Sequence, residues 1–172
     1  KLKLKINSRK SKVVKATESE FLSFTFTGKK IRWAQKCLDR FKYRILKLTS
    51  RRWGVSMQHR LRKLAQYIRG WMGYFRLSEY YRSIPLLDQW IRRRIRCCFL
   101  KQWRKPKTRF KNLVRLGVDK VNAAKIAIAA SSKGYYRLSK TYAVQQALNN
   151  NYLAKVGLVS LKDLWVRFHH HR

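Results

Sequence analysis

The spacing of the apolar residues changes near residue 35, and this change constrains the fold most strongly. Beyond it, apolar side chains recur every three or four residues, as they do in amphipathic helices. The pattern covers about 35–48, about 56–75 and roughly 86–104. Short links join the three segments, so the sequence predicts a three-helix bundle.

The predicted bundle has one apolar face on each helix. The inward residues are Leu38, Phe41, Ile45 and Leu48, then Met57, Leu61, Leu64, Ile68, Trp71 and Phe75, then Leu87, Ile91, Ile95 and Cys98. Ser56 is the expected N-cap of the second helix. Gly70 and Gly73 lie inside that helix, where each costs about 1 kcal/mol relative to Ala. Close approach of another backbone or of a ligand would offset this cost, so Gly70 is predicted as a close helix-packing position.

The residues before 35 are typical of β-strands. Leu or Ile alternates with lysine over 2–6, residues 13–14 and 21–26 are β-branched or aromatic runs, and Gly28 supplies a turn. This predicts a short antiparallel β hairpin. So few strands are marginally stable alone, and the chain opens with Lys1 rather than Met. Both features indicate a segment of a longer protein.

Shorter helices are expected beyond a boundary at 105–107. They cover about 108–116, about 120–130, about 140–149 and about 161–168. Gly117 is expected to end the first of them and 149–151 to end the third. Asp119 and Ser160 are the expected N-caps of the second and the fourth. The predicted fold class is therefore mainly α: a three-helix bundle and a smaller helical domain, preceded by the hairpin.

Cationic residues dominate the composition. Lys and Arg number 43 against 7 acids, a formal net charge of +36. Such a charge is strongly self-repulsive without an anionic partner. Nucleic acid, an acidic membrane and an acidic protein are the alternatives, and nucleic acid is favoured because a polyphosphate supplies regularly spaced charges. The aromatic content excludes a disordered tail. No apolar run reaches the length of a membrane span.

The cysteines give a further indication of location. Cys37, Cys97 and Cys98 show no metal-ligand spacing, and no signal peptide is visible. A reducing, cytoplasmic location is the simplest account.

Four arginines crowd one predicted helix: Arg92, Arg93, Arg94 and Arg96. Repulsion between the like charges at Arg92 and Arg96 costs a few tenths of a kcal/mol. Phosphates against the helix would remove that cost, and the planar guanidinium suits phosphate. Ordinary solvent exposure is the alternative.

The aromatic residues divide into two groups. Trp33, Phe41, Trp71, Phe75 and Trp90 are predicted core residues rather than base-stacking platforms. A second group in connecting stretches could stack on bases, and its role stays open: Tyr74, Tyr80, Tyr81, Tyr135 and Tyr136.

The acidic residues predict no active site. Two-metal phosphoryl transfer needs converging carboxylates, but only Glu18 and Glu20 are close in sequence, in an expected hairpin turn. Asp88 and Asp119 are better explained as acids at helix starts. His59 is isolated, and no Gly-rich phosphate loop occurs.

Several segments resemble one family. They are Phe21–Phe24, Gly28–Trp33, Leu64–Trp71 with Tyr74-Phe75, Leu87–Ile95 and Lys101–Trp103. Together they are similar to the C-terminal part of bacterial group II intron-encoded reverse transcriptases, or maturases. Ser23 departs from the pattern, because the family usually has Gly in this strand.

The resemblance implies an anatomy and a function. Residues 1–34 would end the reverse transcriptase palm, 35–105 form the thumb (domain X), and 106–172 form the DNA-binding domain. Expected partners are group II intron RNA, the template–primer duplex, target DNA and the upstream fingers and palm. The polymerase aspartates and their Mg²⁺ would lie upstream, so no polymerase activity is expected from this segment alone. The expected phosphate-binding residues are Arg51, Arg52, Arg69, Arg92, Arg93, Arg94, Arg96, Lys101 and Arg104.

Two other classes of function are alternatives. A stand-alone basic structural RNA-binding protein would need a self-sufficient fold and a start Met. A complete enzyme is disfavoured by the scarcity of carboxylates.

Overall fold

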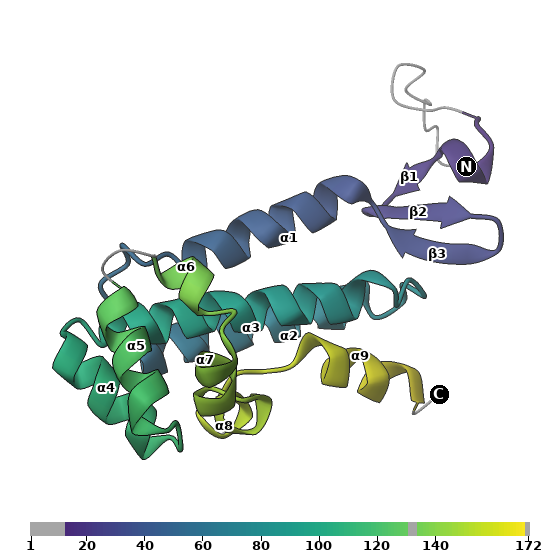
Figure 1. Ribbon diagram of the computed structural model, residues 1–172. Helices are drawn as coiled ribbons and strands as arrows, with labels where there is room; N and C mark the ends of the chain where they lie inside the picture. The colour runs from purple at the N-terminus through teal and green to yellow at the C-terminus, as the bar shows by residue number, and fades with distance from the viewer. Residues whose placement is uncertain (1–12, 131–133, 171–172) are drawn as a thin grey trace.

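The computed structural model describes residues 13–130 and 134–170 and is mainly helical (Figure 1). Three long helices run side by side, with a small sheet at one end and most of the shorter helices at the other. The predicted fold class is confirmed.

The sheet has three antiparallel strands in the order β1-β2-β3. A 3₁₀ turn, η1 (Ala16–Glu18), precedes β1 (Glu20–Phe21), β2 (Phe24–Thr27) and β3 (Lys30–Trp33). The expected hairpin thus has an added strand. Glu18 and Glu20 lie in η1 and β1 rather than in a hairpin turn. Residues 13–14 form no strand, and the alternating residues 2–6 lie outside the described part of the chain.

The departure at Ser23 falls in a tight turn between β1 and β2. Leu22 and Ser23 both have positive φ, 48° and 70°, and Phe21 pairs with Phe24 across them. Two-residue hairpin turns with positive φ at both positions favour glycine or asparagine. Ser23 therefore occupies a backbone conformation that glycine adopts without strain.

The three long helices are α1 (Gln35–Leu48), α2 (Met57–Phe75) and α3 (Ser83–Gln102). All fourteen predicted inward residues are buried. Ser56 caps α2 as predicted, because its Oγ accepts a hydrogen bond from the His59 amide at 3.2 Å. The helical periodicity therefore located the bundle core correctly.

Two predictions about these helices are wrong. The third helix begins at Ser83, three residues before its expected start, because Pro85 fits a first helical turn, where its missing N–H has no partner to lose. Gly70 is not a close helix-packing position: it is exposed, and a Cβ built there would meet no described atom within 4 Å. Its side of α2 faces outward, away from the bundle core.

Six shorter helices follow in the described residues: α4 (Pro106–Arg115), α5 (Lys120–Ala129), α6 (Tyr135–Leu138), α7 (Tyr142–Ala147), α8 (Asn150–Lys155) and α9 (Leu161–His170). Gly117 and Asp119 act as predicted, with φ +87° at Gly117 and the Asn122 amide donating to the Asp119 carboxylate. The expected helix 140–149 is shorter. Residues 149–151 were expected to end this helix, but α8 begins there instead, because Asn149 is its N-cap.

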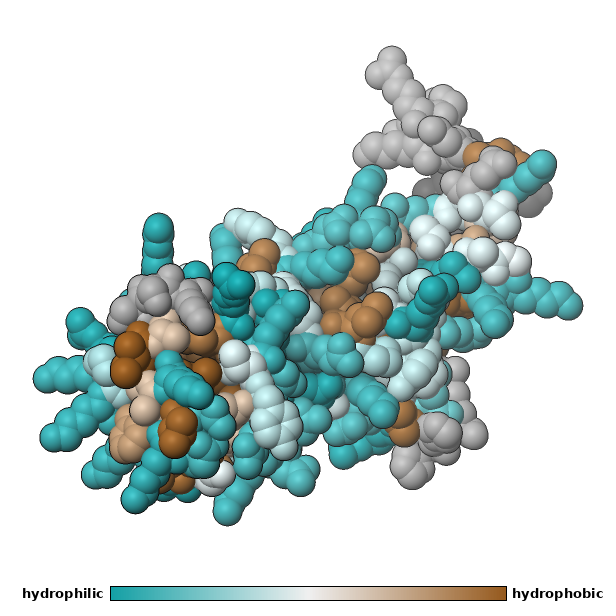
Figure 2. Space-filling model, in the orientation of Figure 1, coloured by the Kyte–Doolittle hydropathy of each residue, from teal (hydrophilic) through white to brown (hydrophobic). Residues whose placement is uncertain are grey.

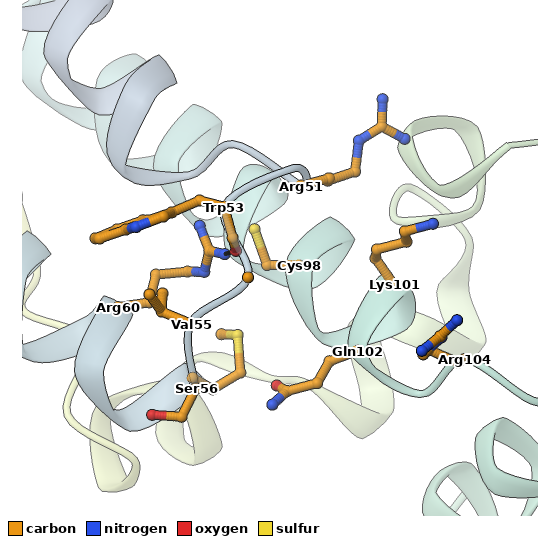
Figure 3. Close-up of a pocket in the computed structure, with 11 residues that line it drawn as sticks. Arg51, Trp53, Val55, Ser56, Arg60, Cys98, Lys101, Gln102 and Arg104 are labelled. Carbon is orange, nitrogen blue, oxygen red and sulfur yellow. Dashed lines mark hydrogen bonds between the residues drawn. The ribbon is translucent and has the colours of Figure 1, made fainter.

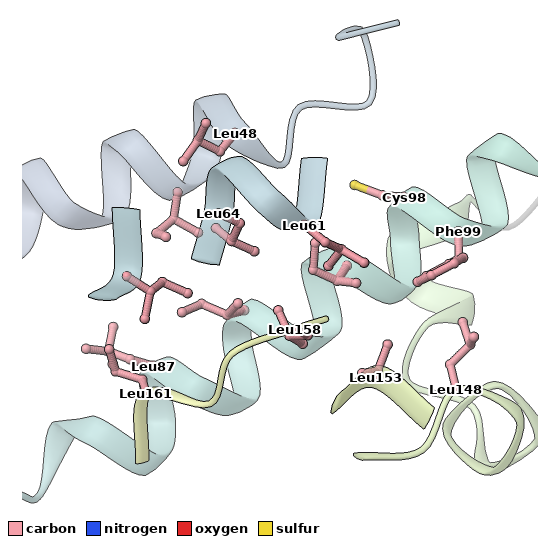
Figure 4. Packing of buried hydrophobic residues seen from close by; sticks show 14 of the residues in the cluster. Leu48, Leu61, Leu64, Leu87, Cys98, Phe99, Leu148, Leu153, Leu158 and Leu161 are labelled. Atoms are coloured by element: carbon pink, nitrogen blue, oxygen red, sulfur yellow. The ribbon is translucent and has the colours of Figure 1, made fainter. Parts of the chain in front are cut away.

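The shorter helices join the bundle through one continuous core. Leu148, Leu153, Leu158 and Leu161 pack near residues of α2 and α3 (Figure 4). Asp88 reinforces this junction: it is 2% exposed, and its carboxylate accepts hydrogen bonds from the Leu161 amide at 2.8 Å and the Ser160 hydroxyl. Asp88 therefore caps α9 across the fold, since a negative charge is favoured at a helix N-terminus.

Candidate nucleic-acid interface

Three buried arginines hold helix ends together. Arg60 donates to the carbonyls of Leu48, Ser50 and Trp53 at 2.7–2.9 Å. Helix C-termini carry unpaired carbonyls and partial negative charge. A guanidinium, with five donors, can satisfy several of these carbonyls at once.

Arg109 and Arg96 follow the same principle. Arg109, 1% exposed, donates to the carbonyls of Ala127, Trp103 and Arg104. Arg96 donates to the Leu148 carbonyl at 2.9 Å, and burial, then the nearby Arg92 charge, lower its pKa. Arg96 was a predicted phosphate ligand. The structure places it 8% exposed, on backbone rather than on open surface.

The other arginines of the α3 cluster are half-buried and partly engaged. Arg92 forms an ion pair with Asp88. Arg93 lies 3.5 Å over the Tyr136 ring and donates to the Tyr136 carbonyl. Arg94 donates to the Thr49 hydroxyl at 2.6 Å. These contacts fix the three guanidinium groups near the surface, although each also serves the fold.

The remaining predicted ligands are exposed: Arg51, Arg52, Arg69, Lys101 and Arg104. Arg51 and Arg52 lie in the loop between α1 and α2, and Lys101 and Arg104 lie at the end of α3. Arg69 lies on the outer face of α2.

Three hollows border α3 at successive positions along its length and on different sides of it, and we call them together the α3 groove. They measure about 360, 320 and 390 Å³. Their cationic and aromatic linings are Arg92, Arg93 and Arg96 with Lys140; Arg51 and Arg94 with Tyr136; and Arg51, Arg60, Lys101 and Arg104 with Trp53. Arg51 is shared by the second and third hollows, so these two adjoin.

The groove brings together seven of the nine predicted phosphate ligands. Arg52 and Arg69 line none of its three hollows. The α3 residues that line the three hollows extend from Gln89 to Gln102, about 20 Å at 1.5 Å per residue.

The charge of the groove is almost uncompensated. Arg92–Asp88 is the single ion pair among the described residues, and no acid lines the groove. Figure 2 shows hydrophilic side chains over most of the visible face, whereas apolar residues gather over α4 and α5. The surface can therefore attract an extended polyanion.

The predicted aromatic core is confirmed for Trp33, Phe41, Trp71 and Phe75, which are buried. Trp90 is half-buried against the same core. Of the connecting tyrosines, Tyr136 borders the groove beneath Arg93, whereas Tyr74 lies by the sheet and donates to the Leu22 carbonyl. Only one of these two is placed near the groove.

Other reactive groups form no site in the described residues. No three His, Cys, Asp or Glu side chains there could hold a metal ion. Burial raises the pKa of the Cys97 and Cys98 thiols, which are the two cysteines beside the groove. No helix in the described ranges is long and apolar enough to span a membrane.

Fold and groove together define a helical protein with a cationic surface built along its third long helix. Residues 38–117 match the family model described as group II intron, maturase-specific domain. This match confirms, over these residues, the resemblance seen in the sequence. A search of curated proteins found no match.

Sequence reasoning missed the buried arginines. Arg60 and Arg109 look like further surface cations, since periodicity places each among polar neighbours. Two features could have indicated them. Lys47 is the single basic residue in the last turn of α1, so its terminal carbonyls need other donors. The chain has only seven acids, so a buried arginine must often be bound by backbone carbonyls instead.

Proposed function

We propose that this chain binds group II intron RNA along the α3 groove and thereby assists the intron in reaching its splicing-competent fold. The matched maturase domain supports a role in intron splicing. The observation that carries the proposal is that six exposed or half-buried predicted phosphate ligands line the three hollows around α3, and no acid lines these hollows.

The same surface would serve the parent reverse transcriptase. We propose that α1–α3 act as its thumb and clamp the template–primer duplex, while α4–α9 contact target DNA. Phosphate recognition is largely independent of sequence, so one groove can hold both kinds of duplex in turn. Mg²⁺ and the polymerase carboxylates belong to the upstream palm in this proposal, and no catalytic step falls to the residues of this chain.

Salt dependence tests the RNA-binding proposal directly. A labelled RNA hairpin titrated with the full chain should bind tightly, with affinity falling steeply as salt rises. Replacing Arg51, Lys101 and Arg104 together by Gln should reduce the slope of log K against log salt by about 2–3, since each duplex phosphate contact contributes about 0.9.

A matched triple variant controls for net charge. Lys36, Lys120 and Lys155 are exposed and line none of the three hollows, so their replacement by Gln should change the slope by less than about 1. A flat salt response of the unaltered chain, equal binding to heparin, or equal effects of the two triple variants would contradict the proposal.

A further inference from the structure

The third hollow of the α3 groove differs from the other two in having an apolar wall. It measures about 390 Å³, within the roughly 300–1,000 Å³ of small-ligand sites. Trp53, Val55 and Met57 form this wall, from the loop before α2 and its first residue. We call it the α2 pocket.

Exposed cations occupy the opposite wall. Figure 3 shows Arg51, Lys101 and Arg104 on one side of the α2 pocket and Trp53 and Val55 on the other. The buried Arg60 lies on the Trp53 side, but its guanidinium is bound to backbone carbonyls. Helix α2 begins at the pocket, so the positive end of its dipole adds to their field. One wall thus suits an anion, and the other suits a flat apolar group.

The pocket also has a hydrogen-bonding side chain. Gln102 is exposed at the end of α3 and lines the pocket, and its amide makes no hydrogen bond to the described residues. An amide offers both donors and an acceptor, which is the chemistry that reads the edge of a nucleobase.

From this arrangement we infer that the α2 pocket binds a single unpaired nucleotide of the RNA. Its phosphate would lie between Arg51, Lys101 and Arg104, its base against Trp53 and Val55, and the base edge beside Gln102. The inference rests on the proposed function, because the pocket opens onto the groove at Arg51. Paired bases stay stacked in a helix, whereas bulged or looped bases can leave it and enter such a site.

Two labelled RNA hairpins that differ by one bulged adenosine provide the test. The full chain should bind the bulged hairpin about tenfold more tightly, the size expected for one base-stacking contact. Val55→Trp should fill the pocket and abolish this preference. Val55 is half-buried in a loop, and a urea titration would verify that the variant folds.

Gln102→Ala provides a gentler probe without loss of charge. It should reduce the preference for the bulge severalfold, whereas Gln66→Ala, an equally exposed change on α2 that lines none of the three hollows, should leave it intact. A retained preference in Val55→Trp would overturn the inference.

The outcomes separate the pocket from the groove. Equal, salt-dependent binding of both hairpins by the unaltered chain overturns the pocket and leaves the proposed function standing. Binding of neither hairpin overturns both. Competition by adenosine monophosphate as strong as that by the bulged hairpin would assign the pocket to a free nucleotide and overturn its assignment to an RNA strand.

Discussion

Arg109→Met tests whether the buried arginines stabilise the fold or only add to its repulsion. Methionine keeps an unbranched side chain but removes four hydrogen bonds to three carbonyls, at 2.8–3.2 Å. Hydrogen bonds from a charged donor contribute about 1.5–3 kcal/mol each, and the effects of neighbours are not additive. The free energy of unfolding should fall by about 3–5 kcal/mol, because three carbonyls lose these donors and an unsatisfied buried group costs about 1–3 kcal/mol.

Urea unfolding followed by far-ultraviolet circular dichroism measures this change at fixed ionic strength. Lys111→Met is the control, because it removes the same charge from an exposed site on the same helix. Its effect should stay within about 0.5 kcal/mol. If Arg109→Met stabilises the chain, or matches Lys111→Met, then Arg109 contributes only self-repulsion and the carbonyl-capping argument is refuted.

Three further predictions concern other parts of the fold. Ser23→Gly should raise the free energy of unfolding by about 0.5–1 kcal/mol by relieving positive φ, whereas Ser19→Gly, at φ −95°, should not; equal urea midpoints would contradict this. Asp88→Ala should lower stability by about 2–3 kcal/mol and increase hydrogen exchange in α9, and unchanged exchange there would argue against the cross-fold cap. Cys97 and Cys98 have pKa values raised by burial, so iodoacetamide should modify them far more slowly in the folded chain than in urea. Because the unfolded thiols lose their protons at lower pH than the buried ones, the free energy of unfolding should fall as the pH rises above the ordinary thiol pKa. The double variant Cys97→Ala/Cys98→Ala should lose less stability at alkaline pH, and a pH profile equal to that of the unaltered chain would contradict this prediction.

Regular patterns made the bundle predictable. Apolar residues at three- and four-residue intervals fixed the inward face of α1–α3, and Ser56, Gly117 and Asp119 marked helix ends through local chemistry. The short helices α6 and α8 were missed, because fewer than two turns give no periodicity and Asn149 is equally typical of a turn and a cap.

The candidate site was only partly predictable for a different reason. Composition indicated a cationic surface, but it could not separate exposed cations from those that serve the fold. Arg96 and Arg109 are buried by contacts with residues 18 to 52 positions away, which no local pattern encodes. Gly70 was misread for the same reason, since a glycine in a helix indicates close packing only if a neighbour exists.

The carbonyl-bound arginines have a consequence for how the protein meets its partner. A carbonyl is a dipole without net charge, so it satisfies a guanidinium without subtracting from the total of +36. Had Arg60, Arg96 and Arg109 been matched by carboxylates, the protein would carry three fewer net charges. The buried arginines thus stabilise the fold without reducing the positive electrostatic potential around the protein. Association with a polyanion should therefore be fast at low ionic strength.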